Sequence, residues 1–116
     1  MAEAVFRHGD PTYMDYTPAA GNVAAGEVVL LGNTTGITCG IAHLDITNAV
    51  LGALAIGGGI YDVTMLENIA PYTKCWWDNS ANKVTTTSTN NALFGFTLEG
   101  NTGVNTVVEV LHWPKA

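Results

Sequence analysis

The chain has 116 residues, a length that fits one domain with one hydrophobic core. Lys and Arg number 4 against 10 Asp and Glu, so the net charge is −6, and this balance argues against binding to nucleic acid or to an anionic membrane surface. Charged residues make up only 12% of the sequence, about half the usual share. The surface must therefore be covered by Thr, Asn, Gly and apolar side chains, which is typical of proteins that bury part of their surface in an assembly.

The first eighteen residues differ from the rest of the chain. Pro11 and Pro18 interrupt them and no apolar period is sustained, so the sequence predicts an extended N-terminal arm over residues 1–18 with at most one short strand at 12–17. The body would then cover 19–116. Two roles stay open for residues 12–17: a strand that adds itself to an exposed sheet edge of a partner, or the first strand of the body itself.

From Gly26 onward, short apolar runs alternate with glycine and other turn residues. This spacing is typical of a sandwich or small barrel of about seven short strands, and no helical stripe of useful length interrupts it. The sequence therefore predicts an all-β, single-domain β-barrel or β-sandwich. The expected strands are 27–31, 36–42, 53–56, 60–66, 92–99 and 105–113, besides a hairpin at 73–87, and residues 67–72 are the one place for a helical turn.

The hairpin at 73–87 has aromatic and β-branched runs on either side of a polar turn at 78–83. Successive strand residues point to opposite faces, so Cys75 and Trp77 share one face and Trp76 lies on the other. We expect Trp77 to enter the core and Trp76 to point outward.

The last expected strand alternates in the same way. One face holds Val108, Val110 and His112, and the other holds Val107, Glu109, Leu111 and Trp113. Trp113 would then lie on the outer face. Outward aromatic side chains are typical interface anchors because they bury a large area at a small cost in entropy.

Residue types that carry chemistry are scattered. His8, His43 and His112 lack ligand spacing and are predicted to be unrelated structural residues. Cys39 and Cys75 form no CxxC pair, and each lies in a strand-like run, which favours two buried free thiols over a disulfide.

Other candidate motifs also fail. Residues 57–59 are three glycines without the following Lys-Ser/Thr of a phosphate loop, so they predict a strand junction that needs unusual dihedral angles. Asp62-Val63-Thr64 lacks the glycine of the Asp-Thr-Gly loop of aspartic peptidases. No catalytic residue, cofactor site or metal site is predicted.

The N-terminus has neither a basic start nor an apolar core of the length that a signal peptide needs. The longest apolar run, at 49–56, is too short to span a bilayer. We therefore expect a soluble protein made in the cytosol.

An ordered set of short motifs runs through nearly the whole chain, from about residue 5 to residue 111. The set comprises FRHGD at 6–10, DYT at 15–17, AGEVV at 25–29, IA at 41–42, DI at 45–46, GALAIGG at 52–58, WD at 77–78, KVTTT at 83–87, LFGF at 93–96 and VEV at 108–110. In this order the chain resembles the phage capsid cement (decoration) proteins, formerly a domain of unknown function sometimes mislabelled as a predicted RecA/RadA-type recombinase. Pro71, Tyr72 and Cys75 depart from the family's usual pattern, in which a glycine turn precedes the Trp-Asp hairpin.

The resemblance implies a small β-barrel that binds the outer surface of a phage capsid, as trimers at the symmetry axes, and stabilises the shell. The implied partners are the major capsid protein and other copies of the chain, with no nucleic acid, membrane, cofactor or catalytic residue. The implied location is the outside of the virion, after synthesis in the cytoplasm of the bacterial host. The alternative is another phage structural β module, such as a tail or baseplate component.

Six residues are candidate contacts with the capsid or with another subunit. Arg7 is the only arginine and could pair with a carboxylate of the shell, and Tyr13 and Tyr16 would lie on opposite faces of the expected strand at 12–17. The full set is Phe6, Arg7, Tyr13, Tyr16, Trp76 and Trp113.

Overall fold

The computed structural model describes residues 3–32, 38–101, 103 and 105–114, which form eight β-strands. The strands are β1 (Ala4–Tyr16), β2 (Val28–Leu31), β3 (Thr38–Ile41), β4 (Gly52–Met65), β5 (Lys74–Asp78), β6 (Lys83–Thr85), β7 (Ala92–Thr97) and β8 (Thr106–His112). No helix is found in these parts of the chain, and hence none with the length and apolarity needed to cross a membrane. The all-β prediction is confirmed. Residues 36–37 of the strand expected at 36–42, and residues 1–2 of the expected arm, lie outside the described residues.

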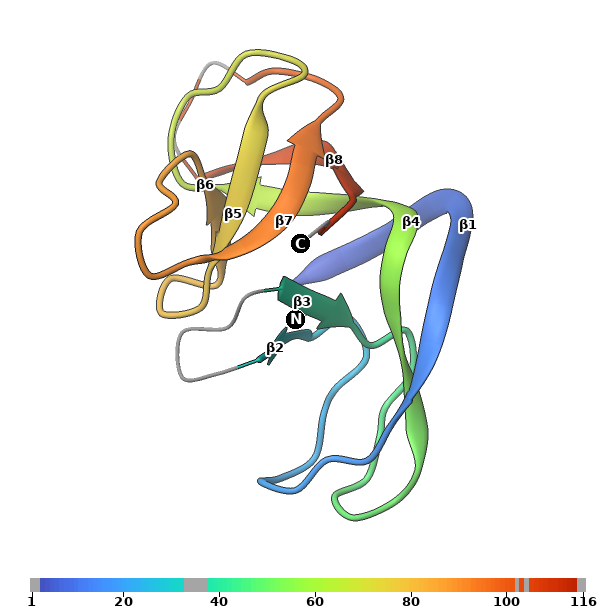
Figure 1. Ribbon diagram of the computed structural model, residues 1–116. Coiled ribbons are helices and arrows are strands. Elements are labelled where there is room, and N and C mark those ends of the chain that lie inside the picture. The colour runs from blue at the N-terminus through green and yellow to red at the C-terminus, as the bar shows by residue number, and fades with distance from the viewer. Residues whose placement is uncertain (1–2, 33–37, 102, 104, 115–116) are drawn as a thin grey trace.

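Five of the strands close into a barrel (Figure 1). The last part of β4 pairs in parallel with β6 through Met65 and Val84, and β6, β5, β7 and β8 then pair antiparallel in that order. The ring closes where β8 returns to β4, from Ile60↔Leu111 to Met65↔Thr106. Strands β1, β2 and β3 lie outside the ring.

The interior of the barrel is filled by the faces that the sequence assigns to it. Cys75 and Trp77 of β5 are fully buried, and Trp76 between them is only partly buried. The same alternation holds on β8, where Val108, Val110 and His112 are fully buried. Both cysteines are buried free thiols, as predicted.

Strand β4 is one strand of 14 residues where the sequence predicts two. The glycines at 57 and 58 have the unusual dihedral angles that were expected, with φ of 157° and 99°, but the strand bends there and continues (Figure 1). Before the bend, β4 pairs with β3 through Ala55 and Ile41, and from Ile60 onward the same strand pairs with β8. Because of the bend, one strand pairs with β3 outside the barrel and with β8 within the barrel wall.

Strand β1 follows β4 along its whole length, from Ala4↔Val63 to Tyr16↔Gly52. The register shifts at three places, two of them between Gly9 and Tyr13, beside the bend of β4. Bulges of this kind increase local bending and twist. The segment expected as a mainly extended arm is therefore a paired strand over residues 4–16, and for residues 12–16 the pairing matches the second role left open above, a strand of the body's own sheet.

A second small core lies outside the barrel, although the chain length suggests a single core. Val23, Ala42, Ile46 and Leu54 are buried together, and Met14, Tyr16, Val29 and Leu31 pack against them. An isolated bridge between Val23 and Ile46 joins the two long connections at 17–27 and 42–51. In Figure 1 these connections lie side by side at the end of the molecule remote from the barrel.

The helical turn considered for residues 67–72 is absent from the structure. Ile69 instead makes an isolated bridge with Asn101, and its amide donates to the Asn101 Oδ1 at 2.8 Å. Tyr72 has a φ of 61°. The segment is an irregular connection tied to the loop before β8, because a prolyl residue at 71 cannot support a helix here.

Candidate interaction surfaces

The exposed large apolar side chains of the described residues gather on two parts of the molecule. Three belong to β1 and three to the connection between β3 and β4. The first group is Val5, Phe6 and Tyr13, the second is Leu44, Val50 and Leu51, and the remaining ones are Tyr72, Val107 and Trp113. Apolar side chains clustered on one surface mark interaction sites more often than scattered ones do.

The aromatic residues of β1 surround His43. The rings of Phe6 and Tyr13 lie 4.7 Å and 5.4 Å from the His43 ring, centroid to centroid, and Phe6 also meets Tyr61 edge-on at 5.5 Å. Phe6 and Tyr13 nevertheless stay 41% and 51% exposed. These two predicted contact residues therefore form one aromatic surface with a rigid base.

Hydrogen bonds fix the base of this surface. The two ring nitrogens of His43 bond to the hydroxyls of Tyr61, at 2.6 Å, and Tyr13, at 3.1 Å. A neutral imidazole offers one donor and one acceptor, so one tyrosine donates and the other accepts. Desolvation lowers the pKa of His43 and raises that of the Tyr61 hydroxyl, which keeps both groups neutral near pH 7.

Two of the three histidines contact the same aromatic ring, although no ligand arrangement joins them. Tyr61 meets the His43 ring at 5.6 Å and the His112 ring at 5.9 Å. His112 in turn meets Phe94 at 5.0 Å, and Phe94 meets Trp77 at 6.1 Å. A continuous series of rings thus connects the exposed surface of β1 to the centre of the barrel.

His112 is held in the barrel as a neutral imidazole. Its Nε2 lies 2.9 Å from the carbonyl oxygen of Cys39 and donates to it, so in the neutral ring Nδ1 carries no proton. Nδ1 is buried without a hydrogen-bond partner. Desolvation, the largest cause, and the nearby His43 lower the pKa of His112 from 6.5 to about 4, against the hydrogen bond to Cys39, which raises it.

We expect the free energy of unfolding to fall as the pH decreases from about 6.5 to about 4. Over this window unfolded His112 binds a proton and folded His112 does not, so stability is complete above the unfolded pKa and declines until the folded pKa is reached. The loss attributable to this residue is about 3 kcal/mol at most. Urea unfolding as a function of pH measures it.

A His112→Gln variant keeps a donor for the Cys39 carbonyl and should lose most of this pH dependence, whereas His8→Asn, on the exposed part of β1, should retain it. If the glutamine variant is too unstable to measure, the ring protons of His112 in the unchanged protein provide the test by NMR. Titration of this ring at its ordinary pKa would contradict the prediction.

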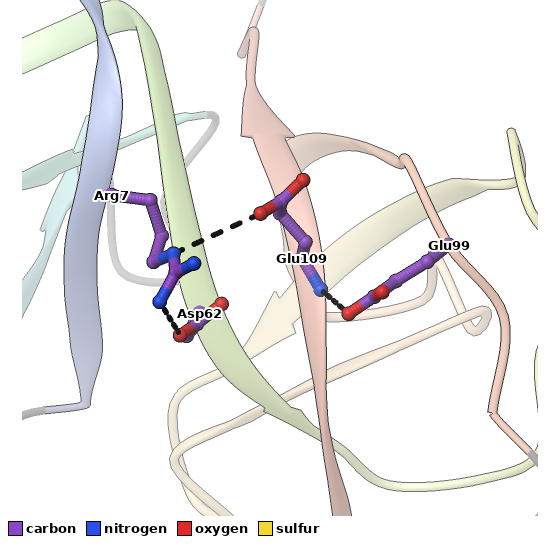
Figure 2. Close-up of polar contacts among 4 residues, drawn as sticks. All are labelled: Arg7, Asp62, Glu99 and Glu109. Carbon is purple, nitrogen blue, oxygen red and sulfur yellow. Dashed lines mark hydrogen bonds and ion pairs between the residues drawn. The ribbon is translucent and has the colours of Figure 1, made fainter.

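Arg7 occupies a bulge of β1, between the paired residues Phe6 and His8. Its guanidinium reaches two carboxylates of the chain itself, Asp62 on β4 at 3.5 Å and Glu109 on β8 at 3.8 Å (Figure 2). Those two residues lie directly opposite each other in the β4–β8 pairing, an arrangement of like charges that is unfavourable without a cation. The three side chains are partly exposed, so the net contribution to stability is small. The expected partner of Arg7 was a carboxylate of the shell, whereas the structure gives its guanidinium two carboxylate partners within the chain.

The remaining predicted contact residues are spread over the surface. Trp76 is partly buried, with the Lys74 ammonium 5.5 Å from its ring centroid. Tyr16 packs against the second core. Trp113 is 51% exposed and, with Pro114, forms one wall of an open groove over the glycines of the β4 bend. The structure therefore brings Phe6, Arg7, Tyr13 and Tyr16 onto one strand, β1, and leaves Trp76 and Trp113 apart from them.

The exposed Leu44, Val50 and Leu51 were not among the predicted contact residues. Val50 and Leu51 belong to the apolar run at 49–56, which leads into the strand expected at 53–56. Nothing in this run indicates that its first residues point outward. The aliphatic pair Val50-Leu51, one residue after the turn residues Thr47 and Asn48, is the one sequence signal that could have pointed to this surface.

No group of three or more His, Cys, Asp or Glu side chains in the described ranges is arranged to hold a metal ion. The Arg7 site contains three carboxylates if Glu99 is included, but the Glu99 carboxylate accepts the backbone amide of Glu109 at 3.0 Å (Figure 2). The polar groups are thus engaged in holding the strands together.

Comparison with known proteins gives the family of the chain. No curated protein matches the chain. The solved structure of the head fiber gp8.5 N base of bacteriophage phi29 is similar to it, with 13% sequence identity, a TM-score of 0.48 and coverage of 90% of this chain and 97% of that chain. The model of the phage cement protein family matches residues 7–112, and the chain therefore belongs to the phage cement protein family.

Proposed function

We propose that the protein binds the outer surface of a phage capsid, through contacts with the major capsid protein, and stabilises the shell. The observation that carries this proposal is the family match over residues 7–112, nearly the whole chain. The surface agrees with the role, because it has few charges and two groups of exposed apolar side chains on a closed barrel and its attached strands. The role is structural, and no step in it requires a catalytic residue or a cofactor.

The direct test mixes the purified protein with shells that lack it and images them by electron cryomicroscopy. We expect repeated density on the outside of the shell, together with a higher temperature of shell disruption. Absence of density at saturating protein concentration, or density inside the shell, would contradict the proposal. Protein mass spectrometry of virions separates the alternative of a tail or baseplate component, because a capsid cement is present in many copies and those components in few.

We further propose that the protein acts as a homotrimer after its synthesis in the host cytoplasm. Trp113 supports this, because a half-exposed indole on a rigid strand end is a suitable anchor for a subunit contact. Partly buried Trp76 on the outer face of β5 is the second candidate. Sedimentation equilibrium gives the oligomeric state, and Trp113→Ala should shift it toward the monomer with an unchanged far-UV spectrum.

Residues 1–18 contribute to this function through β1. The side chains of Phe6 and Tyr13 project from a strand that is already paired with β4, so they can contact the shell or a neighbouring subunit without the cost of ordering a free segment. Removal of residues 1–18 also removes one pairing partner of β4, so the contribution of these two side chains is better tested in a folded variant that carries Phe6→Ala and Tyr13→Ala together.

A further inference from the structure

The end of the molecule remote from the barrel presents an apolar surface on two loops. We define the loop end as residues 17–22 and 47–51. Val50 and Leu51 are 52% and 65% exposed, and Ala19, Ala20 and Ala49 beside them are exposed as well. Leu44, earlier in the same connection, is 77% exposed. Such a group of aliphatic side chains has no role in the fold, because the second core beneath it is formed by other residues.

The loop end is held in one conformation by bonds between its two loops. The Gly21 amide donates to Asn48 Oδ1 at 2.9 Å, and the Asn48 amide donates to Asn22 Oδ1 at 2.8 Å. The Ala49 amide donates to the carbonyl of Pro18 at 2.9 Å. Asn48 therefore joins both loops through its backbone and its side chain.

Ala49 also has a φ of 65°, a left-handed conformation that costs a residue with a Cβ roughly 1–2 kcal/mol. The loop places Val50 and Leu51 outward at this energetic cost, and hydrogen bonds hold it in that conformation. It is therefore preorganised for contact with a partner. Preorganisation of this kind raises affinity because little entropy is lost on binding.

The charges around the loop end are all of one sign. No Lys or Arg occurs between Arg7 and Lys74 in the sequence. Asp15, at the end of β1 opposite Ala53, and Asp45 are exposed, and Glu27 is partly exposed. Asp45 and Glu27 each accept one loop amide, from Ala25 and Ala24, but no cation among the described residues neutralises them.

The apolar side chains of the loop end and the negative charges around it together indicate the chemistry of the partner. An apolar centre with an acidic border is complementary to a protein surface with an apolar centre and Lys or Arg at its border. A second copy docked through the same end would bring carboxylates against carboxylates, and an anionic membrane would repel them.

We propose that the loop end is the surface that docks on the capsid shell, and that it binds an apolar patch of the shell protein bordered by basic side chains. This inference rests on the proposed function. It assigns different partners to the two apolar groups of the surface. The loop end faces the shell, whereas the aromatic side chains of β1 and the C-terminal end of β8 remain for contacts between subunits.

The test compares Leu51→Asp with Val107→Asp in quantitative binding to shells that lack the protein. Val107 is an aliphatic residue of similar exposure, 59%, on β8 of the barrel. We expect Leu51→Asp to weaken the apparent affinity at least tenfold, equivalent to about 1.4 kcal/mol, with melting temperature and oligomeric state unchanged. Val107→Asp and the conservative Leu51→Met should bind as the unchanged protein does. Asp15→Lys should slow association most strongly at low salt, as expected for a basic partner.

Four distinguishable outcomes would each contradict one part of the proposal. If the unchanged protein does not bind shells, the proposed function itself fails. If it binds and Leu51→Asp binds equally well, the loop end is not the docking surface. If Leu51→Asp changes the oligomeric state, the loop end is a contact between copies of the chain. If Asp15→Lys strengthens binding, the border of the partner is acidic and the stated chemistry of the shell patch is wrong.

Discussion

Replacing Gly95 with Ala is expected to lower the free energy of unfolding by about 3 kcal/mol or more, the upper end of the range for overpacking. A Cβ at this position in β7 would overlap the carbonyl oxygen of Leu111 and lie 2.8 Å from the amide nitrogen of Trp113. Both atoms belong to the backbone of the adjacent chain segment, so no side-chain rotation relieves the clash. Gly95 pairs with His112, and the β7–β8 contact that helps to close the barrel would have to separate.

Gly57→Ala is a closely matched control for this change. Gly57 has a φ of 157° and Gly95 one of 155°, so both substitutions place a Cβ on a residue with nearly the same unfavourable φ. A Cβ at Gly57 would meet nothing closer than Pro114 Cδ at 3.8 Å. Urea unfolding followed by far-UV circular dichroism compares the two variants, and equal losses of stability would show that strain rather than the clash decides the outcome.

Trp77→Ala is expected to destabilise the protein by about 3–5 kcal/mol, the usual range for removing a fully buried aromatic side chain. Trp77 has no exposed surface, packs near Phe94 and donates from its indole nitrogen to Asn79 Oδ1 at 3.2 Å. Its removal leaves a cavity at the inner end of the series of rings that begins at β1.

Trp113→Ala provides the comparison, because the same side chain is lost from a position that is 51% exposed. The monomer should change in stability by no more than about 0.5 kcal/mol, as is usual for surface substitutions. Unfolding at a protein concentration below that of self-association isolates this effect. Similar losses for the two tryptophans would mean that the barrel interior relaxes around the cavity at Trp77.

The sequence specifies the inner faces of the barrel because a strand with one buried side has a period of two. On β5 the pattern places Cys75 and Trp77 together, and on β8 it places Val110 and His112 together, and all four are fully buried. A slip of one residue would have reversed each face. The local alternation and the packing of the barrel therefore select the same arrangement.

Other features depend on which strands become neighbours, and local patterns do not carry that information. Asp62 and Glu109 meet beside Arg7 only because β4 lies between β1 and β8. His43, which follows β3, and His112 on β8 both meet Tyr61 because β3 and β8 both pair with β4. The second core likewise requires residues from well-separated stretches of the chain, such as Val23, Ala42 and Leu54.

The continuity of β4 through its glycines was not predicted, for a different reason. A run of three glycines lowers the tendency to form a strand, so the sequence predicts an interruption at 57–59. In the structure, a Cβ at Gly58 would lie 2.9 Å from the carbonyl oxygen of Asp10, which shows that the close approach of β1 requires glycine here. The same glycines from which the sequence predicts an interruption of the strand are the residues that allow β1 and β4 to bend together.

The loop end was missed because exposure of an aliphatic pair cannot be inferred from hydrophobicity alone. Ala49 adopts a left-handed conformation that its residue type disfavours. Its amide bonds to the distant carbonyl of Pro18, and the neighbouring Asn48 bonds to the equally distant Gly21 and Asn22. Tertiary contacts override the local preference at this point.

Strand β1 has a consequence for the solubility of the protein before assembly. Among the described strands it pairs only with β4, so its other edge is open to a strand from another molecule, the usual start of aggregation. Pro11 cannot donate a ladder hydrogen bond, and the three register shifts prevent a continuous flat edge. Side chains of Arg7, Asp10 and Asp15 add charge along the strand. The protein can thus keep a long open edge that resists fibre formation, because that edge offers no run of regular pairing long enough to propagate.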